Sequence, residues 1–212
     1  KGDPGMKRIA VLVSGGGTNL QALIDAQARG ELGAGEIVAV ISSKAGAYAL
    51  ERAKNAGIQS YVLPRKEFDS NKAMTVALVE LLKSLHIDLV VLAGCMVIFT
   101  EELVNAYPNA IMNVHPALIP SFCGPGYYGL RVHEEAIKYG VKLSGATVHF
   151  VSEECDGGPI IAQKAVEVRA DDTPEVLQKR IMEQAEWILL PQAVKAFCDD
   201  RIRVDGRTVI IR

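Results

Sequence analysis

The sequence predicts an α/β protein with a Rossmann-like, mainly parallel twisted sheet that carries helices on both faces. Short apolar runs of strand length alternate along the chain with segments of helical periodicity. At 212 residues and 49% hydrophobic composition, the chain can bury a sizeable core without disulfides or metals. We expect one domain over residues 6–212, and residues 1–5 read as the remnant of an expression tag.

The first half of the chain contains the clearest strand and helix signals. Residues 7–13 form an apolar run that ends in glycines, which is typical of a buried parallel strand. Residues 18–29 place Leu20, Leu23 and Ile24 on one helical face. The same signals predict strands at 36–41, 58–63 and 89–93 and helices at 47–56, which Gly57 closes, and at 70–84.

The second half continues the alternation after a short helix that begins at Thr100. Residues 117–129 are rich in Pro, Gly and Tyr and read as a functional loop, and residues 201–212 read as a hairpin about Asp205–Gly206. The remaining predicted elements are strands at 110–114, 146–151 and 160–168, a helix at 132–139 and a long helix at 174–197.

Composition excludes several classes of function. The net charge of −2 and the pI of about 6.1 give no footprint for nucleic acid or an anionic membrane. The apolar runs are too short to span a bilayer. The four cysteines form no Cys-x-x-Cys pair, which favours reduced thiols, a cytoplasmic location and no metal. Both a monomer and a homodimer remain open.

A glycine-rich turn follows the first predicted strand. Gly16, Gly17, Thr18 and Asn19 precede the first predicted helix, where free N–H groups and the helix dipole attract a phosphate. Leu20 occupies the place of the third glycine of a dinucleotide fingerprint, and no Gly-Lys-Ser/Thr follows. The turn therefore favours a monophosphate, with a plain tight turn as the alternative.

Three polar side chains form the candidate catalytic group. Asn113 and His115 alternate about Val114 at a strand end, so both point to one side. Asp156 lies in a loop that can return it to His115. An amide and an imidazole can stabilise a developing oxyanion, and a carboxylate can hold the imidazolium and accept a proton. The set therefore suits acyl transfer, whereas His86 and His133 read as packed residues.

Four motifs in this order resemble the folate-dependent formyltransferases. They lie at 13–22, 113–120, 145–151 and 156–161, and the resemblance runs from Met6 to about Pro191. It implies the formyltransferase fold. It also implies that 10-formyltetrahydrofolate, as cosubstrate, gives its formyl group to the amine of 5-phosphoribosylglycinamide in purine biosynthesis, without a metal.

The resemblance also implies roles for further residues. The turn at Gly16–Asn19 matches the substrate-phosphate site, and Glu186 matches a carboxylate that holds the glycinamide end. His149 matches a site histidine whose role stays open. The positions that match the folate site are Asn71, Lys72, Met96, Val97, Ile98, Phe99, Asn113, Val151, Glu153, Glu154 and Asp156.

Two of these positions depart from the family pattern. Val97 stands where the family usually has Arg, and Asn71 falls on a usually basic position, which Lys72 could replace. Both departures concern folate affinity rather than the class of reaction.

Other functions remain to be weighed. A formyltransferase acting on a sugar-nucleotide amine should have longer insertions, and a formyltetrahydrofolate hydrolase should have an N-terminal domain and a second His at Pro116. A methionyl-tRNA formyltransferase should have a C-terminal tRNA-binding domain and a basic surface. A non-catalytic phosphate- or folate-binding module would not need Asn113, His115 and Asp156 together.

Overall fold

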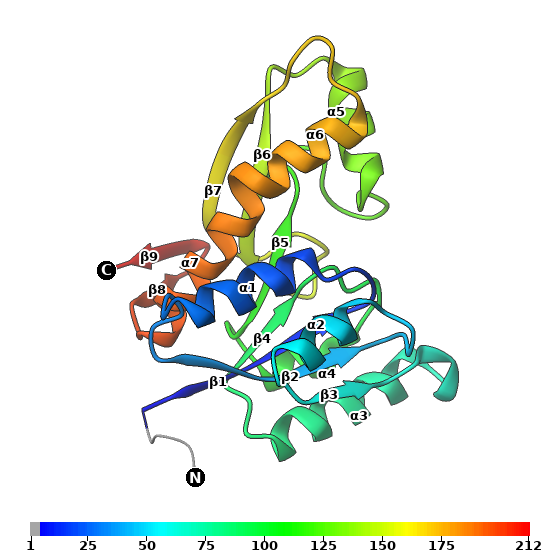
Figure 1. Ribbon diagram of the computed structural model, residues 1–212, viewed down its shortest axis with the longest axis vertical. Helices are drawn as coiled ribbons and strands as arrows, with labels where there is room; N and C mark the ends of the chain where they lie inside the picture. Colours follow the sequence, from blue (N-terminus) through cyan, green and yellow to red (C-terminus); the bar gives the residue numbers. More distant parts are fainter. Residues whose placement is uncertain (1–4) are drawn as a thin grey trace.

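The computed structural model describes residues 5–212, so residues 1–4 of the expected tag remnant lie outside it. A single nine-stranded sheet runs through the described chain in the order β3-β2-β1-β4-β5-β6-β7-β9-β8 (Figure 1). Five neighbouring strands, from β3 to β5, are parallel. This mixed, mainly parallel sheet confirms the predicted fold class.

The elements agree with the predicted ones to within a few residues at most ends. The strands are β1 (Lys7–Val13), β2 (Gly35–Ser42), β3 (Ser60–Val62), β4 (Leu89–Leu92), β5 (Ile111–His115), β6 (Leu143–Phe150), β7 (Ile160–Glu167), β8 (Ile202–Asp205) and β9 (Thr208–Ile211). The helices are α1 (Thr18–Ala28), α2 (Ala49–Asn55), η1 (Arg65–Glu67), α3 (Asn71–Ser84), α4 (Glu101–Ala106), α5 (Leu130–Tyr139), α6 (Pro174–Ile181), η2 (Met182–Glu186) and α7 (Trp187–Cys198).

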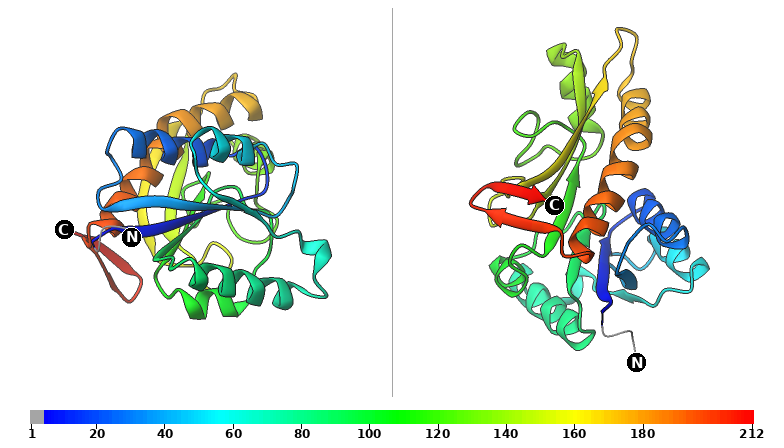
Figure 2. Two further views of the ribbon diagram at one scale, coloured as in Figure 1. Left: turned by 60° about the horizontal axis from the view of Figure 1, so that its bottom comes forward. Right: turned by 90° about the vertical axis from the view of Figure 1, so that its left-hand side faces the viewer.

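Both faces of the sheet are covered, as the alternation of β1 shows. Ile9, Val11 and Val13 pack with α1, α2, α6 and α7 on one face. Ala10 and Leu12 pack with α3 and α4 on the other. Figure 2 shows the two helical layers on opposite sides of the sheet. Within residues 5–212, no helix is long and apolar enough to cross a membrane.

The direction of the chain reverses at β6. This strand is antiparallel to both β5 and β7 and places His149 opposite Asn113. With α5 and α6, the strands β6 and β7 extend beyond the rest of the molecule, at the top of Figure 1. The predicted C-terminal hairpin is present as β8–β9, and β9 joins β7 at the sheet edge. Apolar patterning predicts β6 and β7 as strands but does not predict their direction.

The predicted long helix at 174–197 is not uniform, which corrects the expectation of one regular helix. A π-helical turn, Met182–Glu186, separates α6 from α7. Pro191 lies inside α7, where it cannot donate to the carbonyl four residues earlier. A π turn inserts an extra residue, which hydrophobic periodicity does not reveal, and such turns are frequent at functional sites. Here the turn ends at Glu186, which is buried.

A buried ion pair anchors α6. The Nη1 and Nη2 atoms of Arg180 each donate to the Asp172 carboxylate at 2.6 Å, and Nη1 also donates to the Glu167 carbonyl at 2.9 Å. The two side chains are 9% and 2% exposed. The hydrogen bonds from Arg180 lower the pKa of Asp172 to about 2. This pair therefore fixes the helix that leads to Glu186.

We expect Arg180→Met to lower the free energy of unfolding by about 3–5 kcal/mol at pH 7, because it leaves a buried carboxylate without its cationic partner. Since the pKa of Asp172 is lowered in the folded state, its contribution is lost as the pH falls from about 4 towards about 2. Urea denaturation measures both effects. The control is Lys179→Met, which removes the exposed pair with Glu183 and should cost less than about 1 kcal/mol. Equal costs for the two variants would contradict the anchoring role.

Candidate active site

The candidate site lies where the carboxyl ends of β1, β4 and β5 meet at one edge of the sheet. The glycine-rich turn follows β1, residues 94–99 follow β4, and β5 ends at His115. The Ser14 hydroxyl accepts the Met96 N–H at 2.8 Å and shares a hydrogen bond of 2.7 Å with the Ser43 hydroxyl. These bonds tie together the loops that follow β1, β2 and β4.

Asp156 lies between two histidine rings at the centre of the site. Its Oδ2 is 3.7 Å from His115 Nδ1, and its Oδ1 is 3.7 Å from His149 Nε2. All three side chains are at least 90% buried. Asn113 Nδ2 is 3.3 Å from His149 Nε2. The structure thus brings together the three residues of the predicted catalytic group and adds His149.

The tight turn before β7 sets the position of Asp156. The Gly157 N–H donates to the Glu154 carbonyl at 3.0 Å, and Asp156 adopts the left-handed region at φ 54°. A Cβ on Gly158 would lie 1.7 Å from the Phe150 carbonyl oxygen, so no larger residue fits there. Glycine at position 158 is therefore a steric requirement for the return of the carboxylate to β5.

The loop at 117–129 closes over the catalytic group through its backbone. The Phe122 carbonyl accepts from His115 Nε2 at 2.7 Å, and the Gly124 N–H donates to Asp156 Oδ2 at 2.9 Å. The loop is thus part of the site, as the sequence predicts. Its particular contacts were not predicted, because backbone groups carry no signal in residue type.

His149 fixes the orientation of the Asn113 amide. Its Nδ1 donates to the Phe150 carbonyl at 3.0 Å, and burial lowers the pKa of its ring. The neutral ring protonated on Nδ1 leaves Nε2 as an acceptor for an N–H of Asn113. The second N–H of the amide is then free for a ligand.

His133 of α5 is a site neighbour that sequence reasoning treats only as a packed residue. It is 1% exposed, and neither ring nitrogen has a hydrogen-bond partner among residues 5–212. Burial, assisted by the charge of nearby His115, lowers its pKa to about 4. His133 is therefore neutral at pH 7, and its position on the apolar face of α5 is the only signal for it in the sequence.

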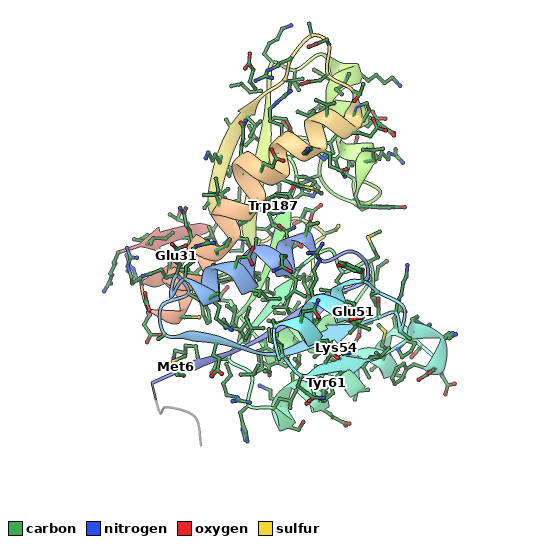
Figure 3. All side chains as sticks on the ribbon, in the orientation of Figure 1. Met6, Glu31, Glu51, Lys54, Tyr61 and Trp187 are labelled. Carbon is green, nitrogen blue, oxygen red and sulfur yellow. The ribbon has the colours of Figure 1, made fainter. Side chains whose placement is uncertain are left out.

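The predicted phosphate turn and Glu186 lie close together. Gly17 adopts φ 75° at the start of α1, and Asn19 Nδ2 donates to Glu186 Oε1 at 3.3 Å. Burial raises the pKa of Glu186 to about 7. Asn19 Oδ1 and Glu186 Oε2 are buried and have no partner within the described chain. Trp187, labelled in Figure 3, marks the helix residue directly after Glu186.

The segment Met96–Phe99 alternates between two environments. Met96 and Ile98 are 55% and 75% exposed. Val97 and Phe99 instead line a narrow apolar hollow against α3. An exposed apolar pair of this kind suits contact with a flat ligand.

The remaining predicted folate positions lie on two separate segments. At the start of α3, Asn71 accepts a hydrogen bond from Arg65, and Lys72 pairs with Glu102 at 3.5 Å. Val151 donates its N–H to the Ile111 carbonyl at 2.8 Å. Glu153 and Glu154 have exposed side chains on the Asp156 turn.

Across residues 5–212, no three His, Cys, Asp or Glu side chains are arranged to hold a metal.

Comparisons with known proteins agree with this arrangement. Residues 7–194 match the formyl transferase family. The chain is 44% identical over 199 residues to phosphoribosylglycinamide formyltransferase of Haemophilus influenzae, covering 94% of this chain and 91% of that protein. The structure of glycinamide ribonucleotide transformylase 1 from Symbiobacterium toebii superposes with a TM-score of 0.92 at 42% identity and covers 99% and 95% of the two chains.

The same fold also occurs in an enzyme with a different named activity. A formyltetrahydrofolate deformylase from Pseudomonas syringae superposes with a TM-score of 0.85 at 28% identity. The match covers 97% of this chain and 66% of the deformylase. The backbone alone therefore does not separate transfer from deformylation.

We expect Glu186→Gln to change how stability depends on pH. Because burial raises the pKa of Glu186 from 4.5 to about 7, the folded wild type loses stability as the pH rises through this window. Glutamine does not ionise, so the variant should gain about 3 kcal/mol relative to the wild type between pH 4.5 and pH 8. Urea denaturation at both pH values measures the difference. The half-exposed Glu183→Gln on the same turn is the control, and parallel behaviour of the two variants would refute the assignment.

Proposed function

The chain belongs to the formyl transferase family, and we propose that Asn113, His115 and Asp156 carry out its reaction. The activity is that of a phosphoribosylglycinamide formyltransferase of purine biosynthesis, for which the family implies 10-formyltetrahydrofolate as cosubstrate. The observation that supports the catalytic assignment best is the Asp156 carboxylate, buried between His115 and His149 and next to Asn113.

The first step is attack of the substrate amine on the formyl carbon. A C–N bond forms, the carbonyl electron pair moves to oxygen, and the nitrogen becomes positive. The free N–H of Asn113 and the N–H of His115 donate to this oxygen. Removal of one such donor typically costs about 10²–10³ in rate. His149 contributes by holding the Asn113 amide in the orientation that leaves this N–H available.

The Phe122 carbonyl marks the place that the formyl oxygen takes. It accepts from His115 Nε2 at 2.7 Å, so a carbonyl oxygen already occupies the position to which Nε2 donates. We propose that the formyl group replaces it when the loop at 117–129 adjusts to substrate. An imidazolium then donates from Nε2 to the developing oxyanion while Nδ1 faces the Asp156 carboxylate.

Asp156 balances the charges of the reaction. Its carboxylate favours the cationic form of His115 and accepts, directly or through water, the proton that the attacking amine must lose. Collapse of the tetrahedral intermediate re-forms the carbonyl and breaks the bond to the folate nitrogen. That nitrogen takes up a proton, which leaves tetrahydrofolate and the formylated amine.

The proposed binding residues for the two ligands lie on separate segments around this centre. We propose that the turn at Gly16–Asn19 binds the substrate phosphate and that Glu186 holds the glycinamide end, because its Oε2 is buried and unpartnered within the described chain. The exposed Met96 and Ile98 contact the folate. Backbone groups at 151–156 read the pterin edge, and Asn71 and Lys72 also belong to the folate site.

A second candidate function is deformylation, in which water replaces the amine as nucleophile. The structural similarity to the deformylase favours this alternative. Pairing of a phosphate turn with the buried Glu186 favours transfer, because water needs neither feature to bind.

We expect His115→Ala and Asp156→Asn each to lower kcat by at least about 10²-fold while the fold stays intact. Asparagine is suitable at position 156 because it tolerates the left-handed region that Asp156 adopts. His86 is exposed and also left-handed just beyond α3, which corrects its reading as a packed residue. It gives the control His86→Asn, which should retain wild-type turnover. Steady-state kinetics with both substrates and circular dichroism provide the measurement. Near-normal turnover in either site variant would remove that residue from the mechanism.

A further inference from the structure

The glycine-rich turn rests on α2 rather than standing alone. The Ala49 N–H donates to the Gly15 carbonyl at 3.0 Å, and Arg52 Nε donates to the Gly16 carbonyl at 2.7 Å. Gly17 is in close contact with the same helix, since a Cβ there would lie 2.7 Å from the Ala49 Cβ. The helix α2 therefore holds the carbonyl side of the turn.

This contact determines where the N–H groups of the turn point. In a trans peptide, the carbonyl and the following N–H point in opposite directions. Because the carbonyls of Gly15 and Gly16 face α2, the N–H groups of Gly16 and Gly17 face away from it. Successive N–H groups of this kind form a concave binding site for an anion, next to the free N–H groups at the start of α1.

Arg52 is itself held in place on three sides. Besides its bond to the Gly16 carbonyl, its Nη1 donates to Gln21 Oε1 at 3.2 Å, and its Cζ lies 4.9 Å from the centre of the Tyr48 ring. Figure 3 labels Glu51 and Lys54 on the same short helix. A planar guanidinium can make these contacts together, whereas a lysine ammonium cannot. The positive charge of Arg52 also favours binding of an anion on the neighbouring turn.

We propose that Arg52 is a positioning residue for the substrate phosphate. It holds the Gly16 carbonyl towards α2, so that the N–H groups of the turn face the phosphate, and it adds positive charge to the site. This role rests on the proposed binding of the phosphate at Gly16–Asn19. Arg52 takes no part in the chemistry at His115.

The test compares phosphoribosylglycinamide with the same molecule lacking its phosphate, at saturating 10-formyltetrahydrofolate. For Arg52→Met, we expect KM for the phosphorylated substrate to rise about tenfold, equivalent to about 1.4 kcal/mol, with kcat within about twofold. The KM for the dephosphorylated substrate should stay unchanged. Arg52→Lys should recover only part of the loss, because it restores the charge but not the guanidinium contacts. Lys54→Met, an exposed position on α2, should match the wild type.

Two other results would overturn the proposed role of Arg52. An equal rise in KM for both substrates would show that Arg52 only supports the fold, and unchanged KM values would show that the turn does not depend on it. Either result overturns the role of Arg52 but leaves the phosphate site standing, provided that the wild type itself prefers the phosphorylated substrate. A wild type without that preference would overturn the phosphate assignment and the role of Arg52 together.

Discussion

The site depends above all on the burial of one carboxylate between two imidazole rings. Asp156 reaches this position because β6 returns antiparallel to β5 and because Gly158 allows the following turn to approach Phe150 closely. A buried carboxylate without partners would be strongly unfavourable, so His115 and the Gly124 N–H must converge on it, while the neutral His149 lies against Asn113. The same convergence orients Asn113 and brings the loop at 117–129 over the site.

Several buried polar atoms around the site are left without hydrogen-bond partners. Asn19 Oδ1, Glu186 Oε2 and both nitrogens of His133 are buried and lack partners within residues 5–212. Burial keeps His133 neutral at pH 7 and raises the pKa of Glu186 to about 7. Unpaired buried groups cost stability, and the ion pair between Asp172 and Arg180 fixes the helix that must carry one of them. The ion pair thus stabilises an element next to the site, whereas the buried polar atoms of the site itself stay unpaired.

The sequence predicts most of the fold because the parallel core has strong local signals. The strands from β1 to β5 are apolar runs, and the strictly spaced motifs locate Asn113, His115 and Asp156. The reversal at β6 and the π turn before Trp187 depend on tertiary packing, which residue patterns do not encode. Contacts made by backbone carbonyls, as at Phe122 and Gly16, leave no mark on residue type, so the roles of the loop and of Arg52 require the structure.

The most direct test of the catalytic account is the release of tetrahydrofolate from 10-formyltetrahydrofolate with and without phosphoribosylglycinamide. Because Asp156 is proposed to take the proton of an attacking amine, tetrahydrofolate should appear only when the amine is present. Its amount should equal that of the formylated product. Release at a comparable rate without the amine would contradict the account and would assign the same residues to deformylation.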